Sequence, residues 1–287
     1  MLHVTCVYTC AHKFRSIVHL HYSERTPVSV DQAREFERLA RGQLNRCPDS
    51  FVHTLDVSGR QWTVSALEAI SELLDEIAET IVIGKFNDMI AGLETVEGLA
   101  TLAYLNDIFQ TAPRLRELCL NDNALGTRGV AALRSLLSIG IERLNLVNTG
   151  IAEADAATLA DIVDPTRLKA FAAGRNQMGA KGAHYIGSLL ARRTSLEHFS
   201  YVGSQPLSEG TAALCTGLAD MSSTNSSLMV LNLTDMSILS NRLSWHETAF
   251  SLNAMSLSNP CSLQWMALLQ FDKTNIWISW CCLSRIL

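Results

Sequence analysis

The sequence lacks any excess of positive charge. Its 287 residues include 23 Lys and Arg against 28 Asp and Glu, which gives a net charge of -5. Proteins that bind the backbone of DNA or RNA need clustered basic residues, so we do not expect a nucleic acid as the partner. Long apolar runs are also missing, because the best stretch, 265–287, is interrupted by Asp272 and Lys273. No segment is therefore expected to span a membrane.

The usual signatures of catalysis are missing as well. We find no Gly-rich phosphate loop, no nucleophile elbow and no zinc-protease motif, and the eight cysteines lack the paired spacing of a disulfide framework or zinc ribbon. Cys6, Cys10 and His12, with His19 and His21 nearby, fit no standard zinc module. We therefore expect no metal, no cofactor and no enzymatic chemistry by the chain itself.

Scattered cysteines suit a reducing compartment. The first ten residues are fairly apolar but lack the basic lead-in and the small-residue cleavage site of a secretory signal. The expected location is therefore the cytoplasm.

What the sequence does contain is a repeat. Hydrophobic residues make up 48% of the chain, and those between Leu115 and Leu125 follow the leucine-rich-repeat pattern L-x-x-L-x-L-x-x-N-x-L, with Asn123 at the polar position. Copies in the same frame begin at Ile141, Leu168 and Leu196. Looser copies begin at Val52 and Leu228, and a blurred one covers Ile81 to Met89. The period of roughly 28 residues is that of the longer leucine-rich repeats.

Each copy predicts a short strand, a turn and a helix. Alternate apolar residues of the strand point inward, and an Asn at the turn can both donate to and accept from backbone groups that would otherwise be buried without partners. Apolar residues at helical spacing follow several of the turns: Leu67, Ile70, Leu74 and Ile77; Val130, Leu133 and Leu137; Ala183, Ile186 and Leu190; Thr211, Leu214 and Leu218. The sequence thus predicts an α/β leucine-rich-repeat solenoid of the ribonuclease-inhibitor-like type, with short parallel strands on the concave face and helices on the convex face.

The two ends of the chain differ from the repeats. We expect an irregular segment at 1–30, a capping helix within 31–50, and the repeat domain over 51–236. The repeat frame is lost after Met236, and 237–287 is rich in Ser, Leu, Cys and Trp. That segment is expected to be irregular, and its abrupt change of composition suggests the hypothesis that it is not part of the native protein.

The amino-acid sequences of the repeats resemble those of a known family. Leu118 to Leu133 reads L-C-L-N-D-N-A-L-G-T-R-G-V-A-A-L, and I-A-G, L-V-N-T-G-I and A-G-R-N-Q-M-G-A-K-G-A occur around it. These phrases, followed by S-L-E-H-F and S-E-G-T-A-A-L, resemble those of plant-type Ran GTPase-activating proteins, in the same order and at similar separations. The resemblance covers roughly Val52 to Leu233.

The resemblance implies a regulator of an enzyme rather than an enzyme. In this family the repeats dock on the small GTPase Ran in its GTP form and brace its switch regions, so that Ran's own Gln orients the attacking water, and no arginine finger is inserted. Matching L-V-N-T-G-I to the family motif places the key Asn at Asn148, with Thr149 at the inward turn position. The implied process is nucleocytoplasmic transport, in the cytoplasm or at the nuclear envelope.

Three further positions follow from the resemblance. The family carries an Arg in contact with Ran directly after I-A-G, where this chain has Leu93. Asp122 and Arg175 occupy the pre-turn positions of the neighbouring repeats and are candidate partner contacts. The alternative hypothesis is a monomeric scaffold that binds another protein on its concave face without activating any GTPase. The concave positions would be Asn121, Asn145, Val147, Ala172, Gly174, Ser200, Val202 and Thr234, a small and weakly polar surface.

Overall fold

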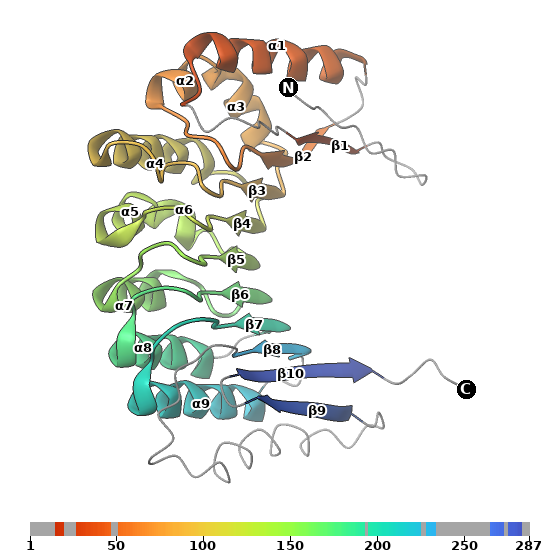
Figure 1. The fold of residues 1–287 in the computed structure, drawn as a ribbon. Coiled ribbons are helices and arrows are strands. Elements are labelled where there is room, and N and C mark those ends of the chain that lie inside the picture. The colour runs from red at the N-terminus through yellow and green to blue at the C-terminus, as the bar shows by residue number, and fades with distance from the viewer. Residues whose placement is uncertain are drawn as a thin grey trace. The chain divides into compact units, whose positions relative to one another are not determined.

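The computed structural model describes residues 15–19, 27–46, 51–192, 195–224, 228–233, 265–272 and 275–282. The chain divides into two compact units, Met1–Ile141 and Glu142–Leu287. Both units have an α/β architecture in which short parallel strands alternate with helices, as Figure 1 shows. Each unit is described by itself.

In the first unit, four strands pair in chain order and all are parallel: β1 (Arg15–His19), β2 (Phe51–Asp56), β3 (Ile83–Lys85) and β4 (Glu117–Cys119). The helices of this unit are α1 (Val30–Arg46), α2 (Val64–Glu68), α3 (Ser71–Ala78), α4 (Thr95–Phe109), α5 (Gly126–Ala132) and α6 (Arg134–Ser138). Helix α4 follows the blurred copy of the repeat and was not predicted from the sequence.

In the second unit, the strands β5 (Arg143–Asn145), β6 (Ala170–Ala172), β7 (His198–Ser200) and β8 (Val230–Asn232) are parallel in the same way. The helices are α7 (Glu153–Ile162), α8 (Gly179–Ala191) and α9 (Leu207–Thr224). A hairpin of β9 (Trp265–Asp272) and β10 (Asn275–Cys282) continues the sheet, with β10 antiparallel to β8.

The ends of the chain contain more regular structure than the sequence predicts. Strand β1 lies inside 1–30, and β9 and β10 lie inside 237–287, two ranges for which the sequence analysis predicted irregular structure. A single strand or hairpin does not recur with the period of roughly 28 residues, so the repeat pattern does not indicate it. Helix α1 covers the segment where a capping helix was expected, and its Phe36 packs edge-on against Trp62, with 6.1 Å between ring centroids.

The apolar residues of the repeat frame form the core. The inward positions of the four clearest copies are at most 3% exposed: Leu118, Leu120 and Leu125; Leu144, Leu146 and Ile151; Phe171, Ala173 and Met178; Phe199 and Tyr201. All the helical positions that the sequence singled out are also buried. The prediction of inward strand positions and apolar helix faces is confirmed. Because each short strand pairs with its neighbours, the core is formed by stacking and not within a single copy.

The asparagine at the turn of one repeat forms hydrogen bonds with backbone groups of the repeat before it. The Asn123 Oδ1 atom accepts hydrogen bonds from the backbone N–H groups of Met89 (2.7 Å) and Ile90 (3.1 Å). Its Nδ2 donates to the carbonyl groups of Phe86 (2.7 Å) and Leu120 (2.9 Å). The preceding copy, with Met89 at its own turn position, therefore obtains its hydrogen bonds from Asn123.

The same arrangement recurs in the second unit. The Asn176 Oδ1 atom accepts from the backbone N–H groups of Thr149 (2.9 Å) and Ile151 (3.2 Å), while Nδ2 donates to the carbonyls of Leu146 (2.7 Å) and Ala173 (3.0 Å). Thr149 adds a hydrogen bond from Oγ1 to the carbonyl of Leu146 (3.1 Å). The predicted role of the turn residues is confirmed at these two turns.

Helices α8 and α9 approach each other closely through residues with small side chains. A Cβ atom added at Gly217 would lie 2.1 Å from the carbonyl oxygen of Gly187, and one added at Gly187 would lie 2.6 Å from that of Ala213. Because real Cβ atoms do not come this close to backbone oxygen atoms, only glycine permits this packing. The distance between the helices is thus set by their glycines.

We predict that Asn176→Ala lowers the free energy of unfolding by about 3 kcal/mol or more, because several buried backbone groups lose their partners at once. The neighbouring Gln177 is exposed, so Gln177→Ala should change the stability by less than about 0.5 kcal/mol. Urea unfolding followed by circular dichroism measures both changes. Equal stabilities of the two variants would contradict the role given to Asn176.

Candidate binding edge

One position has a left-handed backbone in each of the six copies that the structure describes through the turn. The residue directly before the turn position has a positive φ in six successive copies: Gly59 (75°), Asp88 (48°), Asp122 (60°), Asn148 (56°), Arg175 (54°) and Gly203 (60°). Glycine adopts this conformation without strain, and Asn and Asp tolerate it better than other residues. We call Gly59, Asp88 and Asp122 the loop edge of the first unit, and Asn148, Arg175 and Gly203 that of the second.

Backbone hydrogen bonds connect neighbouring members of each loop edge. The N–H of Asp88 donates to the carbonyl of Asn121 (2.9 Å), directly before Asp122. In the second unit, the N–H of Asn148 donates to the carbonyl of Gly174 (3.0 Å), directly before Arg175. These bonds lie beyond the ends of the three-residue strands and hold each edge residue next to the one from the following repeat.

Asn148 is an exposed residue of this edge, and the next residue, Thr149, is fully buried. The turn therefore directs the side chain of Thr149 into the protein, where it donates to the carbonyl of Leu146. Asn148 lies where the chain reverses after β5, and its side chain is accessible to another molecule. This is the arrangement that the sequence analysis expected from L-V-N-T-G-I.

Arg175 lies next to Asn148 on the loop edge of the second unit and is also exposed. A Cβ atom built on Gly203 would lie 3.0 Å from its Cγ atom and 3.8 Å from its Nε atom. The side chain of Arg175 therefore extends over Gly203, where the absence of a side chain leaves room for it. The structure thus brings together Asn148 and Arg175, two of the predicted site residues.

The other two predicted residues belong to the first unit. Asp122 is an exposed member of its loop edge. Leu93 is half-buried, follows the I-A-G phrase, and donates its N–H to the carbonyl of Ile90 (3.0 Å). Leu93 is not a loop-edge residue, because it lies between the turn and the first residues of α4.

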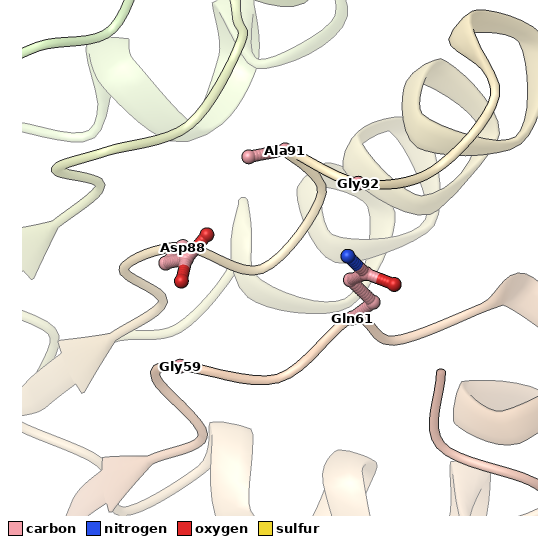
Figure 2. A pocket seen from close by; sticks show the side chains of 5 residues that line it. All are labelled: Gly59, Gln61, Asp88, Ala91 and Gly92. Atoms are coloured by element: carbon pink, nitrogen blue, oxygen red, sulfur yellow. The ribbon is translucent and has the colours of Figure 1, made fainter. Parts of the chain in front are cut away.

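A small cavity opens beside Leu93. Its volume is about 180 Å³, and Figure 2 shows the residues that line it: Gly59, Gln61, Asp88, Ala91 and Gly92. Two of them, Gly59 and Asp88, are loop-edge residues of adjacent repeats. The sequence analysis did not single out Asp88 or Gln61. Asp88 could have been found from the recurrence of Gly, Asp and Asn before the turn position, but Gln61 has no such signal.

The described part of the chain contains no group of three or more His, Cys, Asp or Glu that could hold a metal ion. Cys6, Cys10, His12 and His21 lie outside the described residues, as do the side chain of His19 and the concave residue Thr234. Burial raises the pKa of Cys215 to about 11 and that of Tyr201 to about 12, so both groups are neutral at physiological pH. No described helix is long and apolar enough to cross a membrane.

Comparison with known proteins gives no assignment. No model of a protein family matches the sequence, and no curated protein is significantly similar to it.

Arg175 is the only member of the two loop edges that is not Gly, Asp or Asn. The left-handed backbone costs an ordinary residue about 1 kcal/mol or more, and Asn bears less of this cost. We predict that Arg175→Asn raises the free energy of unfolding by about 0.5 kcal/mol. Arg175→Lys keeps both the charge and the strain and should bring no gain. Chemical denaturation would contradict the prediction if the Lys variant were the more stable of the two.

Proposed function

We propose that this chain is a leucine-rich-repeat protein that activates the small GTPase Ran in nucleocytoplasmic transport. Two kinds of observation support the proposal. The phrases between Val52 and Leu233 resemble those of plant-type Ran GTPase-activating proteins in order and spacing. The observation that carries most weight is the exposure of Asn148 at a tight turn whose inward position is filled by Thr149.

The proposed mechanism requires no chemistry by this chain. Ran holds the nucleotide, and phosphoryl transfer depends mainly on how the attacking water and the catalytic Gln are positioned. The carboxamide of Asn148 offers one acceptor and two donors, so it can hold the carboxamide of that Gln in a productive orientation. The hydrogen bond from the N–H of Asn148 to the carbonyl of Gly174 fixes the backbone from which the side chain extends.

Backbone geometry alone gives a second explanation for an Asn at position 148. Left-handed positions favour Gly, Asp and Asn in any protein, and the equivalent residues Gly59 and Gly203 have no side chain to contribute. A test of the proposal must therefore remove the carboxamide without disturbing the backbone. Asn148→Gly does so, because glycine adopts the same φ without strain.

We predict that Asn148→Gly and Asn148→Ala both reduce Ran GTP hydrolysis stimulated by this protein by about 10² to 10³, the usual effect of losing one well-placed stabilising group. Binding to Ran should be largely retained. Only the Ala variant should also lose stability, by about 1 kcal/mol, because Ala is strained at this φ. Single-turnover hydrolysis and chemical denaturation provide the two measurements.

The result that would refute a role of this side chain is full activity in Asn148→Gly. A wild-type protein that leaves the Ran hydrolysis rate unchanged at micromolar concentration would refute the proposed function as a whole.

A scaffold without GTPase-activating activity is the second candidate function, and Leu93 favours it. A half-buried leucine cannot supply the forked, charge-assisted hydrogen bonds of the Arg found there in the family. Such a scaffold would present the residues that directly follow its strands. In the first unit these include a polar ladder in which Asn87 donates to Ser58 Oγ (3.2 Å) and accepts from the N–H of Asn121 (2.8 Å).

Leu93→Arg separates the two candidates. If the protein is an activator that has lost one contact, the substitution should raise the stimulated hydrolysis rate by about tenfold or more, because it adds a charged hydrogen bond to Ran. Leu93→Gln, which adds a polar group without charge, is the matched control and should give a smaller increase. A scaffold would show no stimulation with either variant in the same hydrolysis assay.

A further inference from the structure

Two of the residues that line the cavity in the first unit are glycines. A Cβ atom on Gly92 would lie 1.6 Å from Nε2 of Gln61, so the carboxamide of Gln61 lies directly over Gly92. At Gly59, with a φ of 75°, an added Cβ would meet nothing within 4 Å, and that side of the cavity stays open. The cavity is therefore open beside Gly59, a loop-edge residue, and Figure 2 shows the residues that line it.

The polar groups of this cavity are suited to a cation. Asp88 provides a carboxylate on one side of the cavity. Gln61 lies on the other side, with its amide nitrogen toward Gly92 and its carboxamide oxygen directed away, as Figure 2 shows. Among the described residues, neither side chain has a hydrogen bond or an ion pair with another group of the protein. A ligand with N–H donors and a positive charge would satisfy the carboxylate of Asp88, whereas this carboxylate repels an anion.

The size of the cavity narrows the choice of ligand. Pockets that hold cofactors and other small molecules usually have volumes of about 300 to 1,000 Å³, and this one has a volume of about 180 Å³. It can take the end of one long side chain but not a nucleotide. Two of its lining residues, Gly59 and Asp88, belong to the loop edge, where a macromolecular partner can reach them.

We propose that this cavity receives a basic side chain, arginine or lysine, of the protein that docks on the loop edge. The inference rests on the proposed function, because it takes that partner to be the GTPase. Asp88 accepts the charge-assisted hydrogen bonds, and the open side of the cavity at Gly59 leaves room for the side chain. The cavity is then a specificity site of the first unit, distinct from the role proposed for Asn148.

The first test is a binding titration of Ran loaded with a non-hydrolysable GTP analogue. Asp88→Asn removes the charge, keeps the shape and suits the left-handed backbone, so it should fold normally. We expect it to raise the Kd by about tenfold, with a smaller difference at high salt. Asp75→Asn removes the same charge from an exposed position of α3 and should leave the Kd unchanged.

The second test uses a model ligand and does not depend on Ran. Nα-acetyl-arginine methylamide at millimolar concentration should shift the NMR signals of the Gly59 and Gly92 amides and of the Gln61 carboxamide. The same compound should have no effect on Asp88→Asn, and the uncharged norleucine analogue should have none on the wild type.

The two tests distinguish two kinds of failure. Shifts with the arginine compound, but no binding of Ran to the wild type, would refute the proposed function and leave a cation site for another protein. Binding of Ran with the same Kd for wild type and Asp88→Asn would refute the inference, whatever the NMR result.

Discussion

The fold depends on hydrogen bonding at the buried turns. Each short strand ends in a turn that faces the core, where backbone N–H and C=O groups would be costly without partners. Asn176 satisfies groups from Leu146, Thr149 and Ile151, all in the preceding repeat, as well as the carbonyl of Ala173 in its own. The side chain that closes one turn therefore belongs to the next repeat, and neither turn is satisfied unless the two repeats are stacked.

This dependence explains why the turn position tolerates different residues. Thr149 and Met89 stand where the repeat pattern has Asn, and in both cases the following repeat provides the missing carboxamide, from Asn176 and Asn123. It also explains the residue before the turn. The chain must reverse within one residue to bring the turn side chain inward, which requires a left-handed backbone and points the preceding side chain outward.

Much of this could be predicted from the sequence. The apolar frame around Leu118, Leu144 and Phe171 identified three strands, because a period of 28 residues with inward apolar positions has few other interpretations. The copy at β3 was blurred for a physical reason. Gly84 replaces the central apolar residue, and the ring of Phe86 occupies its space, with Cε2 2.8 Å from where a Cβ would lie. Phe86 fills the space that a side chain at position 84 would occupy, so neither residue taken alone indicates the strand.

The two candidate sites, Asn148 and the cavity beside Asp88, also differ in how far the sequence could predict them. The exposure of Asn148 follows from local rules, since a buried turn residue requires its neighbour to face outward. The cavity beside Asp88 does not, because it depends on Gln61 lying over Gly92, a residue of the following repeat. Sequence patterns reveal which positions of a repeat are equivalent, whereas a hollow between two repeats depends on how side chains of different copies meet. The contact of Gln61 with Gly92 is of this kind, and Asp122, in the next copy, lines no part of the cavity.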